Sequence, residues 1–373
     1  AISPNNDKFV KLLALGSIFF ISVSVGFSAK AQLLNLSDLP LFVSTNVDPN
    51  IIVTFDDSGS MMWGYLPDSI RDDDGTRRAA SVAFNRGYYD PTIDYRPPLD
   101  SLGNEAADAD FSNAINAAYG DDGADTQGSG WPSGNRLNLG SEYRITWNVF
   151  GNGWGPVFSA DPDSPGGGAR PAFYYNYDYT NAGCPDTSND GVADSSENEA
   201  CYDRVVVSAT SGTARPRPEF GGVISQDERT NFANWYQWYR YRMLSGKTAL
   251  SRAFGPEQVG SNVRVARQTL NRRGPESGDP STDNTSGPDH VASLTNQERT
   301  YFYNWLQGIR GRSGGTPLRQ AMDEAGEHYT LSNANSPYRE IPGNSGSGEV
   351  SCRINTHILL SDGNWNGSEP GDI

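Results

Sequence analysis

The sequence predicts an α/β fold, with a mostly parallel sheet flanked by helices. Two apolar runs, over residues 50–55 and 356–360, have the composition of buried parallel strands, and each leads to an aspartate. Residues 227–250 and 299–325 instead repeat apolar side chains at helical spacing. Strands that alternate with helices are typical of a parallel sheet with its connecting helices packed on it.

Composition and charge exclude some classes of function. The 373 residues include 41 glycines and 23 prolines and are 36% hydrophobic, so much of the chain is expected to be surface loop. The length is enough for two domains. The formal net charge of −16 argues against nucleic-acid binding, which requires basic patches.

Residues 1–31 have the layout of a secretory signal peptide. Lys8 and Lys11 precede an apolar run over 12–25, and an A-x-A cleavage site ends at Ala31. The alternative is a membrane anchor, but the run falls short of the roughly 20 residues that span a bilayer. We therefore expect an exported protein that has no membrane segment after cleavage.

The strand over 50–55 leads directly into the pentapeptide Asp56-Asp57-Ser58-Gly59-Ser60. Open parallel sheets bind ligands beyond the carboxyl ends of their strands. Carboxylate and hydroxyl oxygens are suitable ligands for Mg²⁺, Mn²⁺ or Ca²⁺. Asp and Ser are also common in turns and helix N-caps, so the pentapeptide alone is compatible with either interpretation.

The polar, loop-rich stretch over 66–222 reads as a large insertion in the sheet domain, which would comprise 32–65 and 223–373. Residues 143–150 alternate apolar and polar side chains, and 204–208 is rich in valine, so both are expected to form short strands. The tyrosine pairs of this insertion, Tyr88-Tyr89 and Tyr174-Tyr175, are expected to pack in a core rather than to contact a ligand.

Cysteine usage agrees with export. Cys184 and Cys201 bracket a polar loop and are expected to form a disulfide, as oxidising compartments permit. Closing a loop of this size stabilises the fold by about 3 kcal/mol in the chain-entropy model. Cys352 is then left over, either as a buried free thiol or with a partner outside this sequence.

The loop between these cysteines contains a candidate calcium site. Its twelve residues match the EF-hand spacing of oxygen ligands, with a glycine at the sixth position. The segment before the loop does not look helical, so a paired EF-hand is not expected. The alternative is an acidic surface loop made of ordinary turn residues. The candidate Ca²⁺ ligands are Asp186, Ser188, Asp190, the backbone carbonyl of Val192, Asp194 and Glu197.

Residues 227–250 predict one long helix. Its apolar face consists of Phe232, Trp235, Tyr239, Met243 and Leu250. Arg240 and Arg242 on the same helix are expected to be solvated or salt-bridged.

After that helix, residues 263–268 alternate as a strand and 299–310 predict a second helix. A glycine loop with Thr316 follows, and Pro317 suits the first turn of a third helix. Its apolar face is expected to contain Leu318, Met322 and Ala325.

The chain ends with the second apolar run and Asp362, which completes a set of oxygen ligands. We predict that Asp56, Ser58, Ser60, Thr316 and Asp362 bind one Mg²⁺ or Ca²⁺ ion. Two carboxylates and three hydroxyls leave one coordination position of the ion open, so an acidic group of a partner can complete its coordination.

This order and spacing resemble the metal-ion-dependent adhesion site of von Willebrand factor A domains, which have a Rossmann-like fold. Longer stretches resemble the PilY family of type IV pilus tip-associated proteins. They are LPLFVS at 39–44, YYDP at 88–91, the tryptophan and arginine segment at 234–243, GGTPLRQA at 314–321, CRIN at 352–355 and SDGNWN at 361–366. The family usually has threonine where Ser361 stands, a change that keeps a hydroxyl.

The resemblance implies an N-terminal von Willebrand factor A domain followed by a β-propeller. It also implies roles in pilus assembly, restraint of retraction, adhesion and surface sensing, with minor pilins and an acidic host or surface ligand as partners. Such a protein crosses the periplasm and outer membrane to the pilus tip. We expect this chain to be an N-terminal fragment with a truncated A domain; the alternative is a secreted A-domain adhesin unrelated to pili.

An enzymatic function is not expected. Asp57-Ser58-Gly59 is also the D-[ST]-G core of aspartic proteases, but that mechanism needs two carboxylates that share a proton. No second D-[ST]-G occurs in the sequence. Two of the three histidines, His328 and His357, fall in a predicted helix and strand, where core or surface placement is the ordinary interpretation.

Overall fold

The computed structural model describes the part of the chain that holds both predicted metal-site strands. The described residues are 47–73, 75–116, 136–148, 157–158, 161–163, 168–184, 198–212, 215–217, 222–224, 227–271, 290–309, 311, 315–363 and 365–367. The predicted signal peptide and the predicted calcium loop lie outside these residues.

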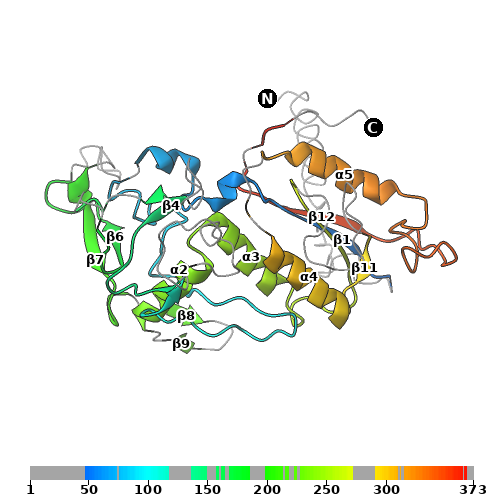
Figure 1. Cartoon of the computed structure of the whole chain (residues 1–373), viewed down its shortest axis with the longest axis horizontal. Coiled ribbons are helices and arrows are strands. Elements are labelled where there is room, and N and C mark those ends of the chain that lie inside the picture. The colour runs from blue at the N-terminus through cyan, green and yellow to red at the C-terminus, as the bar shows by residue number, and fades with distance from the viewer. Residues whose placement is uncertain are drawn as a thin grey trace, which may run out of the picture. The chain divides into compact units, whose positions relative to one another are not determined.

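A four-stranded sheet, in the order β11-β10-β1-β12, organises the fold (Figure 1). β1 (Asn50–Phe55) pairs in parallel with β10 (Arg264–Thr269) and with β12 (Asn355–Leu360). The short β11 (Ala292–Ser293) pairs antiparallel with β10. The predicted parallel-rich α/β sheet is therefore confirmed, and β1 has the bounds that the apolar run indicated.

The register brings the carboxyl ends of the three parallel strands to one edge. Phe55 at the end of β1 pairs with Thr269 and with Leu360, the last residues of β10 and β12. The residues that follow, including Asp56 and Ser361, therefore lie side by side at this edge.

Helices cover both faces of the sheet because side chains alternate along β1. Val53 and Phe55 pack with α3 (Arg242–Ala253) and α4 (Asn296–Gly308), whereas Ile52 packs with α5 (Leu318–Thr330). Figure 1 shows α5 on one side of the strands and α3 and α4 on the other. Helices on both faces explain why all six residues of β10 are buried despite its alternating sequence.

The single long helix predicted over 227–250 is wrong. Residues 228–238 form α2 (Glu228–Trp238), and an extended residue, Tyr241, separates it from α3. The Tyr239 carbonyl accepts a hydrogen bond from the Ser245 hydroxyl at 2.7 Å, and the Arg242 amide donates to the Trp63 carbonyl at 3.3 Å. These contacts replace helical hydrogen bonds at the break.

The two helices bury their apolar faces in different cores. Phe232 and Trp235 of α2 pack among the aromatic residues of the insertion, including Tyr88 and Tyr89. Met243 and Leu250 of α3 instead pack beneath the sheet. The tyrosine pairs of the insertion thus form a core, as expected from the sequence.

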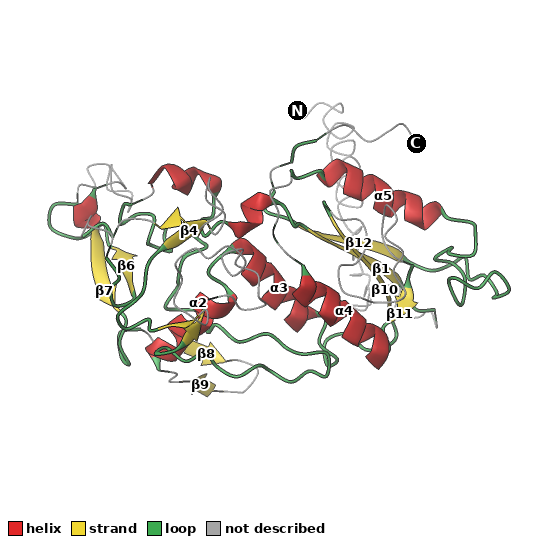
Figure 2. Cartoon of the chain, in the orientation of Figure 1, coloured by secondary structure: helices red, strands yellow, loops and turns green. Residues whose placement is uncertain are grey.

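The described part of the insertion contains short antiparallel hairpins and 3₁₀ turns (Figure 2). The hairpins are β2 (Ala114–Ile115) with β3 (Arg136–Leu137), β4 (Thr146–Asn148) with β5 (Val157–Phe158), β6 (Phe173–Tyr177) with β7 (Tyr202–Val206), and β8 (Arg215–Arg217) with β9 (Gly222–Ile224). The described 3₁₀ turns of the insertion are η3 (Asp68–Asp73) and η5 (Glu199–Cys201), and η2 (Gly59–Met62) follows β1 before the insertion begins.

Two details of the later helices differ from the sequence prediction. α4 begins at Asn296, before the predicted start, because the Thr295 hydroxyl caps its first turn by accepting from the Glu298 amide at 3.4 Å. On α5, Met322 is 54% exposed, and the buried side is formed by Ala321, Ala325 and His328. Among the described residues, no helix is long and apolar enough to cross a membrane.

Candidate metal site

The candidate site begins where β1 ends. The Asp56 amide donates to the Leu360 carbonyl at 2.9 Å, so the β1–β12 ladder continues through this residue. The Asp56 carboxylate is fully buried and accepts from the Ser58 amide at 2.8 Å and from the Ser361 hydroxyl at 2.7 Å. The Ser58 and Ser60 hydroxyls lie 3.1 Å apart. Asp56, Ser58 and Ser60 therefore form one connected cluster, as their spacing predicted.

Burial is the main cause of a raised pKa at Asp56, and the negative charge of Asp362 raises this pKa further. The carboxylates at the ends of β1 and β12 therefore act on each other electrostatically. Two carboxylates in a buried environment repel, and a bound cation relieves that repulsion.

Asp57 is also buried, although the sequence suggested no structural role for this residue. Its carboxylate accepts from the Asn271 amide at 2.8 Å and from the Asn271 side chain at 3.2 Å. Burial raises the pKa of Asp57 to about 6. The Asn271 side chain also donates to the Gly315 carbonyl at 2.7 Å, so Asn271 connects the end of β10 to the loop that carries Thr316.

Thr316 is held by Asn366. The Thr316 amide donates to Asn366 Oδ1 at 2.8 Å, and the Asn366 amide donates to the Thr316 carbonyl at 3.0 Å. Gly315 makes this approach possible, because a Cβ at that position would lie 2.3 Å from Asn366 Oδ1. Thr316 is buried between the loop and the segment that follows β12.

Asp362 is paired with an arginine that the metal motif did not include. Arg242 donates to Asp362 Oδ2 at 2.6 Å, and the side chains of Arg242 and Asp362 are 9% and 2% exposed. Asp362 Oδ1 is buried and has no hydrogen-bond partner among the described residues. Arg242 is therefore salt-bridged, as expected. Arg240 is 3% exposed and hydrogen-bonded to backbone carbonyls, so solvation is wrong for it.

The donor set fits a hard cation. Asp56 and Asp362 supply carboxylates at the ends of neighbouring strands, and the free Oδ1 of Asp362 is an orphaned acceptor in a buried position. Within the described ranges, no group of three or more His, Cys, Asp and Glu residues is placed to hold a metal ion. A metal at this edge would therefore depend on hydroxyl oxygens as well, which is the chemistry that Ser58, Ser60 and Thr316 offer.

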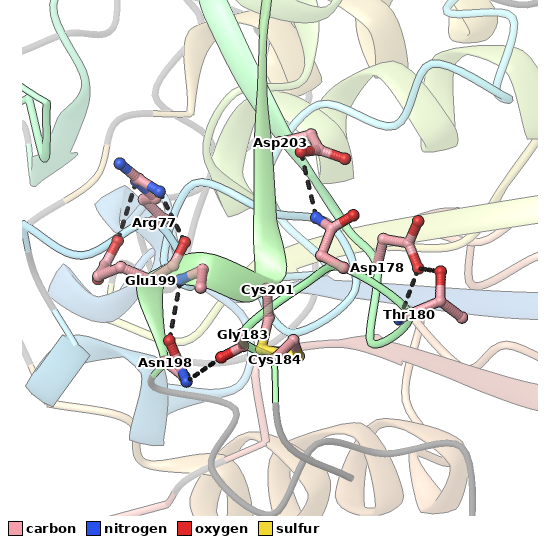
Figure 3. The surroundings of a disulfide bond; sticks show 11 residues. Arg77, Asp178, Thr180, Gly183, Cys184, Asn198, Glu199, Cys201 and Asp203 are labelled. Atoms are coloured by element: carbon pink, nitrogen blue, oxygen red, sulfur yellow. Dashed lines mark hydrogen bonds and ion pairs between the residues drawn. A yellow bond between two sulfur atoms is a disulfide. The ribbon is translucent and has the colours of Figure 1, made fainter.

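The predicted disulfide is confirmed. Cys184 and Cys201 are bonded, with a Cα–Cα distance of 4.9 Å (Figure 3). Asn198 connects the residues next to the two cysteines. Its side chain donates to the Gly183 carbonyl at 3.0 Å and accepts from the Ala200 amide at 2.9 Å. The six candidate calcium ligands between the cysteines lie outside the described residues, so that site stays a prediction. Cys352 is a free cysteine on the surface, so the expectation that it could be buried is wrong.

The chain also contains one G-x-S-x-G spacing, from Gly311 to Gly315. In serine hydrolases this motif forms a sharp turn between a strand and a helix. Here it follows α4, a helix that ends at Gly308. His328 lies on α5 and His357 on β12, where its ring nitrogen is 2.8 Å from the Thr54 hydroxyl. The serine of this motif, Ser313, lies outside the described residues.

Comparison with known proteins gives three curated relatives with one name. The chain is 35% identical over 338 residues to the type IV pilus biogenesis factor PilY1 of Pseudomonas aeruginosa strain PAK, and 32% identical over 370 residues to that of strain UCBPP-PA14. These matches cover 90% and 97% of this chain, but only 25% and 27% of the relatives. The chain thus spans about a quarter of the length of the relatives that it matches. No family model matches the chain. No solved structure matches it.

Proposed function

Because the chain belongs to the PilY family over the segment shared with these relatives, we propose that it is the ligand-binding part of a type IV pilus biogenesis factor. In this proposal the sheet is that of a von Willebrand factor A domain. A Mg²⁺ or Ca²⁺ ion at the carboxyl ends of β1 and β12 binds an acidic group of a host or surface ligand. Minor pilins at the pilus tip are the proposed partners.

The free oxygen of Asp362 is the observation that carries this proposal. A buried carboxylate oxygen without a partner is costly unless a proton, a donor or a cation satisfies it. Asp56 lies at the end of the neighbouring strand and interacts electrostatically with Asp362, so a second carboxylate is available to a cation. A cation held by so few carboxylates keeps the capacity to bind a further carboxylate.

The carboxylates and hydroxyls of the site favour ligand binding over catalysis. The raised pKa values of Asp56 and Asp57 have a structural cause in burial, and neither carboxylate is paired with a histidine in the described residues. The proposed role is therefore adhesion and pilus biogenesis, at the cell surface after export.

Calorimetric titration of the full chain with Mg²⁺ and Ca²⁺ tests the proposal. We expect a heat of binding and a rise in melting temperature in the wild type, because an ion that binds only the folded state stabilises it. Asp362→Asn is expected to lose both effects of Mg²⁺. Asp178→Asn, an exposed aspartate of the insertion, is the matched control and is expected to keep them. Equal Mg²⁺ binding by wild type and Asp362→Asn would refute the metal site.

A further inference from the structure

Arg242 is the only arginine or lysine that the structure places in an ion pair with the candidate metal site, among the described residues. It is the first residue of α3, and its guanidinium reaches the Asp362 oxygen that does not face the proposed ion. The pair is almost completely buried, so solvent and salt screen the arginine charge only weakly.

The segment that leads from the sheet domain into the insertion fixes the other edge of the same guanidinium. Arg242 Nε and an outer nitrogen donate to the Tyr65 carbonyl at 3.1 and 2.7 Å, and the outer nitrogen also bonds to Asp68. The rings of Trp63 and Tyr65 lie 5.5 and 5.6 Å from the guanidinium carbon. Arg242 would have to break all of these contacts to leave Asp362, so its positive charge stays beside the site.

We propose that Arg242 is a built-in counter-charge that weakens divalent-ion binding and keeps the ion exchangeable. The inference rests on the proposed metal site and concerns its affinity. Asp56 and Asp362 provide two negative charges, and Arg242, which also pairs with Asp68, offsets part of this charge. An arginine is always protonated, so this offset does not vary with pH. A cation that enters gains the attraction of the carboxylates and meets the repulsion of the arginine.

The same contact stabilises the fold without an ion. Removing one partner of a buried ion pair leaves an uncompensated charge, which is strongly destabilising. Asp362 is 2% exposed and would be such a charge if Arg242 were neutral. Arg242 and the ion can therefore each compensate the negative charge of Asp362. The stability of a variant without the arginine should depend on the ion.

Arg242→Gln and Arg242→Lys separate charge from geometry. We expect Arg242→Gln to bind Mg²⁺ about tenfold or more tightly than the wild type, and to melt at a lower temperature without ions. Arg242→Lys keeps the charge and is expected to stay within about threefold of the wild-type affinity. Arg240→Gln is the matched control, because Arg240 is a second buried arginine of this segment but hydrogen-bonds to the Tyr236 and Asn116 carbonyls. It should lower stability and leave the Mg²⁺ affinity unchanged.

Each outcome of the calorimetric titration decides the question. Equal affinity in Arg242→Gln and the wild type overturns the counter-charge, and weaker binding means that the arginine positions Asp362 instead. If Arg242→Gln folds only when Mg²⁺ is present, the ion has replaced the arginine charge and the proposal holds. If it fails to fold even at millimolar Mg²⁺, the proposal is wrong. Absence of binding in the wild type and in Arg242→Gln alike would refute the metal site itself, and the counter-charge with it.

Discussion

At the scale of single residues, Gly315 determines where Thr316 lies. A side chain at Gly315 would collide with the Asn366 amide that anchors the Thr316 backbone. We expect Gly315→Ala to release Thr316 and to weaken Mg²⁺ binding about tenfold, a loss of about 1.4 kcal/mol. Isothermal titration calorimetry with Mg²⁺ measures this change in affinity.

Gly326→Ala is the control for that variant. Gly326 lies within α5, and a Cβ there would meet nothing within 4 Å. Alanine is favoured over glycine inside a helix, so this variant should gain about 0.5–1 kcal/mol of stability and keep the wild-type affinity. Unchanged affinity in Gly315→Ala would show that the contact with Asn366 does not position a ligand.

His328 gives the fold a defined pH dependence. Burial lowers its pKa to about 4, and Nε2 has no hydrogen-bond partner among the described residues. In the unfolded chain the pKa is about 6.5, so between these values the unfolded chain binds a proton that the folded chain does not. This contribution to stability is therefore level above about pH 6.5 and falls as the pH drops toward 4, by about 3 kcal/mol in total.

The difference between wild type and His328→Leu isolates this effect from the carboxylates. Urea unfolding at several pH values should show that the stability of the wild type falls more steeply below pH 6.5 than that of His328→Leu. Parallel curves for wild type and His328→Leu would contradict the assignment.

Local sequence predicted the Asp56 cluster but not the residues that surround it. Asp56, Ser58 and Ser60 follow one strand, so their proximity follows from spacing alone. Arg242 and Asn271 reach the site from distant segments, and no local pattern marks them. The fold has to be known before such contacts can be recognised.

At the scale of secondary structure elements, the strands were more predictable than the helix boundaries. β1 is an apolar run buried by helices on both faces, and burial selects such runs, whereas the apolar run of β12 forms a partly buried edge strand. The break between α2 and α3 was missed because Trp235, Tyr239 and Met243 keep a helical period across it. Periodicity reports that a face is buried, but it does not distinguish one core from two.

The disulfide-bounded loop carries a prediction at this scale. We expect the Cys184→Ser, Cys201→Ser double variant to lose about 3 kcal/mol of unfolding free energy, because the loop is no longer closed in the unfolded chain. Chemical denaturation of the full chain under oxidising conditions measures this loss. A loss well below 1 kcal/mol would mean that the fold holds the loop without the bond.

Calcium binding by the loop is tested separately. Glu197 stands at the position that supplies a bidentate ligand in EF-hand loops, so Glu197→Ala should remove one heat of Ca²⁺ binding and leave that of the Asp56 site. The double variant Glu197→Ala, Asp362→Asn should bind no Ca²⁺. An unchanged titration for Glu197→Ala would identify the loop as an acidic turn.

At the scale of the whole molecule, Arg242 connects the segment that leads into the insertion with the carboxyl end of the sheet. Its backbone and side chain contact the Trp63–Asp68 segment, and its guanidinium contacts Asp362 after β12. A force that moves the insertion would therefore act on the residue that balances the charge of the proposed metal site. Ligand affinity and mechanical load are coupled if two arrangements of these contacts differ in their affinity for the ion.

Attachment and twitching of bacteria that carry Asp362→Ala in the full-length protein test the function in its cellular setting. If the ion at this site binds a surface ligand, loss of Asp362 leaves too few carboxylates to hold the ion, and attachment should fall several-fold. Among the described residues, Arg242 would then keep only Asp68 as an ion-pair partner, so export and protein level must be compared with those of the wild type by immunoblot. Asp178→Ala, an exposed aspartate of the insertion, serves as the control and should attach normally. Wild-type attachment and twitching by an exported Asp362→Ala protein would show that adhesion does not depend on this ion.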